Sequence, residues 1–417
     1  MQFKSHASSL SVLISLFFIW GFITCLNDLL IPHLKAVFDL NYTQAMLVQL
    51  CFFMAYFIVS IPSGILIEKI GYKLGIVFGL LIAGIGCALF YPAAAFHQYL
   101  LFLFALFVLA SGITLLQVAA NPYVTVLGRP ETASSRLTLT QAFNSLGTAI
   151  APLLGALWFL SVPLKSNTEI NGLTIDELAV YQSMEAASVQ TPYLTIAMVL
   201  WMLSLVFMAL KLPDPVVNKE RPSPANKHEQ SAWGCPHLKQ GVLGIFLYVG
   251  AEVAIGSFMV SFLSNPDIAA LNTEVAGQLV SIYWGGAMVG RFLGAWLMQY
   301  FRAGIVLAVH ALLACALVVI ACQSSGDLAK WSLLSVGFCN SIMFPTIFSM
   351  ALTGLGTRSG QGSGYLCSAI VGGALVPVLQ GFLADIWGLQ LALILPAFCY
   401  AYIMYYGWRF RGLIKTT

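Results

Sequence analysis

Charged residues are scarce in this chain. Only 8% of its 417 residues are Asp, Glu, Lys or Arg, against roughly 25% in a soluble globular domain. Hydrophobic residues make up 59% of the chain and gather in long runs. This balance excludes an ordinary soluble domain and indicates an integral membrane protein.

Motifs for covalent chemistry are also missing. The nine cysteines stand mostly alone within apolar runs, without a CxxC pair or the spacing of metal ligands, so we interpret them as small buried apolar residues. The sequence shows no arrangement of nucleophile, base and orienting residue, and no basic patch with interleaved aromatics suggests nucleic acid. We therefore expect no enzyme activity, no catalytic residue, no organic cofactor and no nucleic-acid partner.

Twelve apolar stretches have about the length of 20 residues that a helix needs to cross a bilayer. They predict an all-α integral membrane protein with twelve transmembrane helices, near residues 9–36, 43–67, 74–95, 98–127, 136–161, 191–212, 238–264, 274–300, 304–323, 328–355, 361–386 and 389–410. The first stretch is longer than the core of a signal peptide and lacks a small-residue cleavage site, so we expect it to remain as the first span.

Lys and Arg are distributed unevenly between the predicted loops. If the N-terminus is cytoplasmic, fifteen of the nineteen lie on that side, three lie on the other, and Arg291 lies within a span. Because cytoplasmic loops carry an excess of Lys and Arg, both termini are predicted to be cytoplasmic. Arg291 needs a partner or a route to the interface, and the cytoplasmic end of its helix is near enough for snorkelling.

The longest strongly polar segment divides the chain. It lies between residues 211 and 239 and is rich in proline, which is typical of a linker. The fifth and eleventh spans share a pattern, since each places a proline five residues after a glycine. We predict an N-terminal six-helix half at 1–212, a cytoplasmic linker at 213–237 and a C-terminal six-helix half at 238–417.

Asp28 is the most informative residue, because it lies in the first apolar span, where an ionised carboxylate is costly. Acids inside a membrane tend to face a cavity and to mark an ion or proton pathway. The alternative is a structural acid that caps a kinked helix or pairs with a neighbour. Glu252 in the seventh span is a second apparently intramembrane acid, in the opposite half.

The loop between spans two and three carries a motif. The segment GILIEKIGYK begins at Gly64 and places an acid, a base, a glycine and a second base at fixed spacing. Gly64 would let two helices approach closely, while Glu68, Lys69 and Lys73 can make gating contacts that exist in only one access state. The alternative is an ordinary positive cytoplasmic turn. The motif resembles the loop signature of the major facilitator superfamily, which implies a substrate site near the midplane, between two six-helix halves.

Three further segments narrow the resemblance. They are FFIWGFITCLNDLLIPHLK in span one, LLQVAANPYVTVLGRPETASSRLTLTQAFNSLG in span four and its following loop, and NSIMFPTIF in span ten. They resemble the fucose, galactose and glucose symporter family, and within it the bacterial glucose/galactose transporters more than L-fucose permease. The resemblance covers nearly the whole chain. It implies a symporter that imports a neutral hexose by alternating access.

The resemblance also implies a cation site. Asp28 matches the acid of the first-span motif in L-fucose permease, and Gln117 stands where that permease has a second acid. An amide cannot release a proton, although it can ligate Na⁺ or bind a hydroxyl. Either Glu252 takes over a titrating role, or the carrier uses Na⁺ with Asp28, Asn27 and Gln117 as ligands. We favour Na⁺ over H⁺, which makes Asp28 a candidate metal ligand.

Neutral amides and tryptophans within the spans suit a sugar. Gln141 and Asn144 are three residues apart, so their amides share one helix face. Each buried amide needs a partner or a cavity, and the alternative to substrate contact is an interhelical hydrogen bond. Trp20 and Trp284 are candidates for stacking on the sugar ring, although packing is the commoner role. The predicted substrate-binding residues are Asp28, Gln117, Gln141, Asn144, Glu252, Trp284 and Asn340.

We interpret the chain as a monomeric, cation-coupled importer of a neutral hexose in the bacterial inner membrane, with glucose or galactose as the favoured substrate. Its partners are then the sugar, Na⁺ or H⁺, and the lipid bilayer. The main alternative is an exporter of drugs or metabolites built on the same fold, since fold does not dictate function. Such an exporter would need a wider apolar cavity with fewer convergent amides.

Overall fold

A computed structural model describes residues 10–25, 42–96, 98–159, 174–210, 212 and 231–413. Within these residues the regular structure consists of helices, and no strand occurs. Asp28, Asn27 and residues 213–230 of the predicted linker lie outside the described residues.

The described chain crosses the molecule twelve times, which confirms the predicted all-α architecture with twelve transmembrane helices. The first six passes are Leu10–Cys25, α2 (Tyr42–Ile70), α3 (Tyr72–Ala95), α4 (Tyr99–Val126), α5 (Ala133–Phe159) and α7 (Ile175–Ala209). The other six are α8 (Pro236–Ser264), α9 (Thr273–Leu297), α10 (Ala303–Gln323), α11 with α12 (Gly326–Asn340 and Met343–Leu352), α13 with α14 (Ser359–Ser368 and Gly372–Trp387) and α15 (Ile394–Arg409).

Apolar composition accounts for most of these passes. Nine of the described helical runs are long and apolar enough to cross a bilayer. Leu10–Cys25 is apolar but shorter. The helix α5 is less apolar because it buries several polar side chains, among them Ser134, Ser135, Thr138 and Gln141. Polar groups at these positions must find partners inside the protein, since lipid offers none.

Three passes differ from their predicted form. The helix α7 begins at Ile175 rather than near residue 191, because Thr174 and Glu177 form a capping box that starts the helix before its apolar part. The tenth pass is broken at Ser341, between α11 and α12. Pro345 falls in the first turn of α12, where its missing N–H costs little. The eleventh pass is broken by the short 3₁₀ turn η5 (Ala369–Val371).

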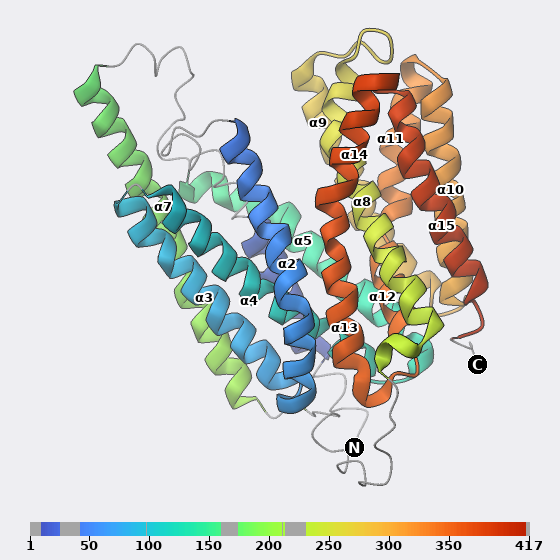
Figure 1. The fold of residues 1–417 in the computed structure, drawn as a ribbon, viewed down its shortest axis with the longest axis horizontal. Coiled ribbons are helices and arrows are strands. Elements are labelled where there is room, and N and C mark those ends of the chain that lie inside the picture. Colours follow the sequence, from blue (N-terminus) through green and yellow to red (C-terminus); the bar gives the residue numbers. More distant parts are fainter. Residues whose placement is uncertain are drawn as a thin grey trace.

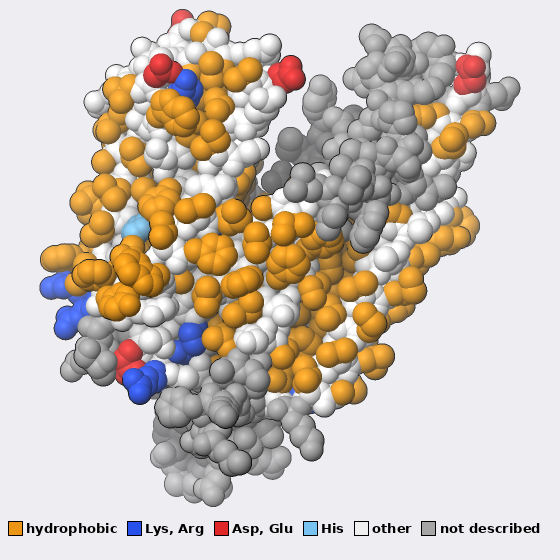
Figure 2. All heavy atoms as spheres, turned by 180° about the vertical axis from the view of Figure 1, so that it is seen from behind, with side chains coloured by type: hydrophobic (Ala, Val, Ile, Leu, Met, Phe, Trp, Pro, Cys, Tyr) orange, Lys and Arg blue, Asp and Glu red, His pale blue; other side chains and the backbone are white. Residues whose placement is uncertain are grey.

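The helices form two bundles, one from the passes before the linker and one from those after it (Figure 1). Within the first bundle α3 packs on α4 and α7, and within the second α10 packs on α11 and α15. The face in Figure 2 is largely hydrophobic between its two ends, and most of its Lys, Arg, Asp and Glu side chains gather at the ends. That distribution suits a surface in contact with lipid.

The bundles meet at one end of the molecule, which we call the closed end. It is the end where α2 and α4 finish and where α8 begins (Figure 1). There α2 packs against α13 and, separately, α5 packs against α9 and α12. Toward the opposite end the two bundles lean apart (Figure 1).

Candidate functional site

A cavity of about 310 Å³ lies between the two halves. Eight passes contribute to its wall, four from each half. The lining residues are Trp20, Thr24, Phe52, Tyr56, Gln117, Gln141, Asn144, Tyr248, Val249, Glu252, Arg291, Phe344, Pro345 and Ile370. The structure thus brings together four of the residues predicted to bind substrate.

The first helix and α5 form one wall of this cavity. They cross so closely that a Cβ atom on Gly21 would lie 2.0 Å from the backbone oxygen of Asn144, and one on Gly147 would lie 2.1 Å from that of Phe18. Side chains longer than hydrogen would force the helices apart. The Asn144 amide donates to the backbone oxygen of Phe17 at 2.9 Å, and this bond fixes the amide at the cavity wall.

Two further amides lie on the same side. Gln117 on α4 is buried and reaches the cavity. Gln141 is also buried, and its Nε2 donates to Oδ1 of Asn121 over a long 3.5 Å. The Nδ2 atom of Asn121 is buried without a hydrogen-bond partner. A small rotation of Gln141 would therefore release donors and acceptors to a ligand at little cost.

The C-terminal half supplies the charged groups. Glu252 on α8 accepts a hydrogen bond of 2.7 Å from the Tyr248 hydroxyl, one helical turn away. Asn340 is buried at the end of α11 and does not line the cavity; its Nδ2 donates to the Tyr283 hydroxyl at 2.8 Å. The Tyr248 hydroxyl lies 3.2 Å from the backbone oxygen of Asn340. Asn340 thus belongs to a polar network directly behind Glu252.

Arg291 also points into the cavity, so its side chain does not snorkel to the interface. Its Nε donates to the backbone oxygen of Ser341 at 3.2 Å, and its Nη1 donates to the hydroxyl of Ser145 on α5. The second bond joins the two halves. Arg291 interacts electrostatically with Glu252 but makes no direct ion pair with it. Glu252 and Arg291 are the charged residues among the described lining residues.

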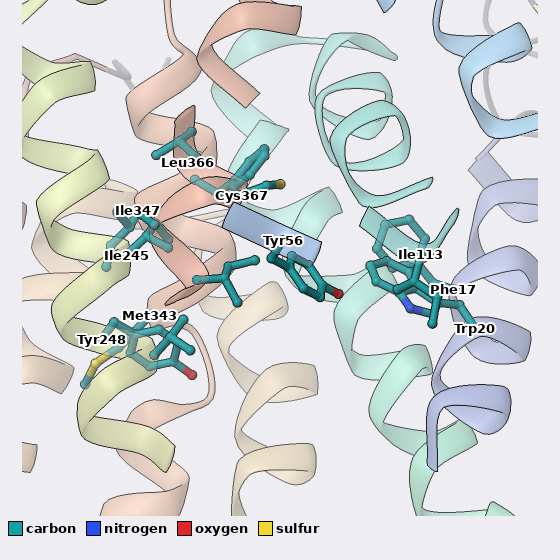
Figure 3. Close-up of a cluster of buried hydrophobic side chains, with 14 of the residues drawn as sticks. Phe17, Trp20, Tyr56, Ile113, Ile245, Tyr248, Met343, Ile347, Leu366 and Cys367 are labelled. Carbon is teal, nitrogen blue, oxygen red and sulfur yellow. The ribbon is translucent and has the colours of Figure 1, made fainter. Parts of the chain in front are cut away.

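Flat apolar surfaces lie next to these polar groups. Trp20, Phe52, Tyr56 and Phe344 line the cavity, and Figure 3 shows Trp20 and Tyr56 on the side opposite Tyr248. Trp284 is not among the lining residues. It is 45% exposed and packs edge-on against Tyr283, so of the two candidate tryptophans the structure brings only Trp20 to the cavity wall.

The predicted gating residues fall into two groups. Gly64 and Glu68 contact the other half: a Cβ atom on Gly64 would lie 2.5 Å from the Gly360 oxygen, and the Glu68 carboxylate accepts two bonds of 3.0 Å from Gln361. Lys73 instead donates to the Met208 oxygen at 2.8 Å, within its own half. Lys69 is exposed. The first group therefore joins α2 to α13 at the closed end.

A second cavity of about 350 Å³ lies at the closed end, between the loop after α4 and the loop after α12. Its lining residues include the hydroxyl-bearing Thr125, Ser349, Thr353 and Ser359 together with apolar residues such as Val126 and Leu352. It contains none of the predicted substrate-binding residues. The central cavity, with its convergent amides, aromatic faces and charges, is therefore the better candidate for the functional site.

The sequence analysis missed several lining residues. Tyr56, Tyr248 and Phe344 were not singled out, because an aromatic side chain in an apolar helix is usually a packing residue. One signal was available: Tyr248 precedes Glu252 by four residues, a spacing that places both side chains on one helix face. For Tyr56 and Phe344 the sequence carried no comparable signal.

Comparison with known proteins agrees with this architecture. A profile of the Major Facilitator Superfamily matches residues 12–370. The chain is 56% identical to a glucose/galactose transporter of Brucella abortus (strain 9-941), over 97% of this chain and 94% of that protein. It is 36% identical to the L-fucose-proton symporter of Escherichia coli K12, over 100% of this chain and 95% of that one. A crystal structure of the transporter FucP in the outward conformation superposes with a TM-score of 0.91 at 36% identity, covering 98% of this chain and 99% of the other.

Proposed function

This chain belongs to the Major Facilitator Superfamily, and we propose that it imports a neutral hexose, glucose or galactose, together with a proton. The family accounts for a multi-pass membrane transporter, and the names of its similar relatives support a sugar as the cargo. The lining of the central cavity is the observation that carries the proposal.

Sugar recognition needs two kinds of surface, and the cavity offers both. Hydroxyl groups of a hexose need neutral donors and acceptors, which Gln117, Gln141 and Asn144 provide from α4 and α5. The C–H faces of the ring need flat apolar partners, which Trp20 and Phe344 provide from opposite halves. A ligand that touches both halves is held where alternating access requires it.

The arrangement around Glu252 favours a proton as the coupling ion. A Na⁺ site requires several oxygen ligands and no competing cation close by. The described neighbours of Glu252 are a hydroxyl that donates to it and the guanidinium of Arg291, which would repel Na⁺. A proton needs only the carboxylate itself. The similar relatives whose names state a coupling ion are fucose-proton symporters, which also supports H⁺ over the Na⁺ that the sequence favoured.

Loading would then govern the movement of the two halves. With a proton on Glu252 and a hexose between the amides, the cavity can close without an ionised carboxylate in its wall, while Arg291 keeps its hydrogen bonds to Ser145 and Ser341. The predicted cytoplasmic Lys and Arg residues fall at the closed end, at the ends of α2, α4 and α15, which supports a cytoplasmic position for the closed end. The cavity in this conformation would load from the outside.

Uptake in proteoliposomes tests the proposal. We expect labelled glucose or galactose to accumulate when an inward pH gradient is imposed, and not when a Na⁺ gradient is imposed at equal pH on both sides. A panel of unlabelled sugars ranks the hexoses. Glu252→Gln should abolish accumulation, while Asp385→Asn, which neutralises an exposed acid outside the cavity, should leave it intact. Uptake driven by Na⁺ alone would refute proton coupling, and dye efflux without sugar uptake would favour the exporter.

A further inference from the structure

The Tyr248 hydroxyl stands between two acceptors but has one proton to give. One acceptor is the Glu252 carboxylate at 2.7 Å, and the other is the backbone oxygen of Asn340 at 3.2 Å. Asn340 is the last residue of α11, at the break in the tenth pass. Carbonyl groups at the end of a helix lack partners within the helix, so this carbonyl depends on a donor from outside.

The charge of Glu252 decides to which of the two acceptors the Tyr248 hydroxyl donates its hydrogen bond. A carboxylate is the stronger acceptor, because charge-assisted hydrogen bonds are roughly twice as strong as neutral ones. The distances in this conformation agree, since the bond to Glu252 is the shorter by 0.5 Å (3.2 minus 2.7). Once Glu252 is protonated, the advantage is lost, and the hydroxyl is free to bond the Asn340 carbonyl instead.

We propose that Tyr248 is a positioning residue that reports the charge of Glu252 to the break in the tenth pass. This inference rests on the proposed function, because it needs Glu252 to gain and lose the coupling proton. That proton binds a Glu252 oxygen from the cavity, and Tyr248 keeps its own proton while its O–H bond turns.

Several buried polar groups at the break could be hydrogen-bonded in a second arrangement of the chain. The Oδ1 of Asn340, the Oγ of Ser341 and the hydroxyl of Tyr400 are all buried without a hydrogen-bond partner. Unsatisfied buried groups are costly, so any rearrangement that pairs them is favoured. A new donor at the Asn340 carbonyl would change which of these groups can be paired.

The break is connected to both the cavity and the closed end. Phe344 and Pro345, in the first turn of α12, line the cavity. About one turn further along α12, Ser349 bonds the hydroxyl of Ser134 in the other half at 2.7 Å. Because a ten-residue helix is a stiff element, a tilt that begins at Asn340 moves the sugar contact and the contact between the halves together.

Other polar and charged groups also face Glu252 and could respond to its charge. Arg291 and Tyr283 approach from α9 and Tyr400 from α15, and Gln117, Gln141 and Asn144 share the cavity from the N-terminal half. None of these groups has described hydrogen bonds to both Glu252 and the backbone of α11, whereas Tyr248 has both.

Substitution of Tyr248 by Phe tests the inference. Tyr248→Phe keeps the ring and removes the hydroxyl. Tyr406→Phe is the matched control, because Tyr406 is equally buried and its hydroxyl also donates to a backbone oxygen, that of His237 at 3.3 Å, away from Glu252. Hexose exchange across the membrane measures how the lost hydroxyl affects sugar binding, because Tyr248 lines the cavity, whereas proton-driven accumulation also depends on coupling. Proton-driven accumulation should fall by about tenfold or more. The pH dependence of exchange should also flatten, which a purely structural role would not cause.

A cross-linking measurement covers the case in which Tyr248→Phe folds poorly. Ser134→Cys with Ser349→Cys should cross-link readily in the closed conformation. A protease site inserted between residues 213 and 230 allows the chain to be cut between the halves. Halves that stay joined after the cut are cross-linked. With Tyr248 present, lowering the pH should reduce cross-linking by about threefold or more, whereas in a Glu252→Gln background pH should have no effect.

The outcomes separate the two proposals. If Glu252→Gln abolishes accumulation but Tyr248→Phe behaves like Tyr406→Phe in accumulation and pH profile, the role of Tyr248 is wrong and the transport function stands. Cross-linking that ignores pH in the unmodified background would also overturn the role of Tyr248. If Glu252→Gln accumulates sugar normally, the proton site itself is wrong.

Discussion

Adding one methyl group at Gly64 should open the closed end. The Cβ of Gly64→Ala would lie 2.5 Å from the Gly360 oxygen and 3.1 Å from its carbonyl carbon. Both atoms belong to backbone, so no side chain can move aside. Restoring an ordinary contact requires α2 and α13 to separate by about 1 Å.

The cost of this separation can be worked out from the contacts that it disturbs. Overpacking of this kind costs about 1–3 kcal/mol. A 1 Å separation also stretches the two 3.0 Å bonds between Gln361 and Glu68 beyond hydrogen-bond range. These losses together amount to about 3 kcal/mol, which shifts the equilibrium toward the conformation open at this end by about a hundredfold.

Labelling of a cysteine at Ser349 measures this shift. Ser349 is 2% exposed in the closed conformation, so Ser349→Cys should react with an impermeant maleimide added at the closed side only when that end opens. The labelling rate therefore reports the open population, after subtraction of the rate for the chain without the added cysteine. Gly64→Ala should raise that rate at least tenfold. Gly285→Ala on α9 is the control, because nothing lies within 4 Å of its added Cβ. Equal rates in the two variants would refute this reasoning.

Three other predictions concern the cavity and the contacts between the halves. Asp28→Asn should abolish gradient-driven accumulation of labelled hexose, and an unchanged accumulation ratio would remove Asp28 from coupling. Asn144→Ala should raise KM for the hexose by about tenfold or more, because both a sugar partner and the 2.9 Å bond to Phe17 are lost; a KM within twofold of the parent would exclude it from binding. Ser134→Ala and Ser349→Ala share one buried hydrogen bond, so a double-mutant cycle on the inward–outward equilibrium should give a coupling of about 1 kcal/mol, whereas additive effects would show that the bond contributes nothing.

The sequence predicted the number of helical passes because apolar length is a strong constraint in a membrane. Twelve stretches were long enough, and each corresponds to a pass in the structure. The position of the central amides was also accessible, since Gln141 and Asn144 have few ways to be satisfied in lipid other than by facing the interior. Gly64 and Glu68 could be assigned to a contact because their spacing resembled a known loop motif.

Orientation around each helix axis was much harder to predict. A helix that is apolar on all sides has no polar face to show which residues point inward. The sequence therefore left Arg291 with either a partner or a route to the interface, and the structure shows that it bonds Ser145 and Ser341 in the interior. Trp284 was grouped with the sugar contacts for the same reason, and it lies outside the cavity wall. The break at Ser341 was not predicted from the sequence.

At the closed end the two halves are joined mainly by hydrogen bonds between uncharged groups. In the part of the chain that the structure describes, hydroxyls of Ser134, Ser135 and Ser363 bond hydroxyl or carbonyl partners across the halves, and Glu68 adds a carboxylate. Dissolved ions weaken charge pairs but act little on buried neutral hydrogen bonds. The contact between the halves at this end should therefore respond little to ionic strength, in contrast to one built from ion pairs.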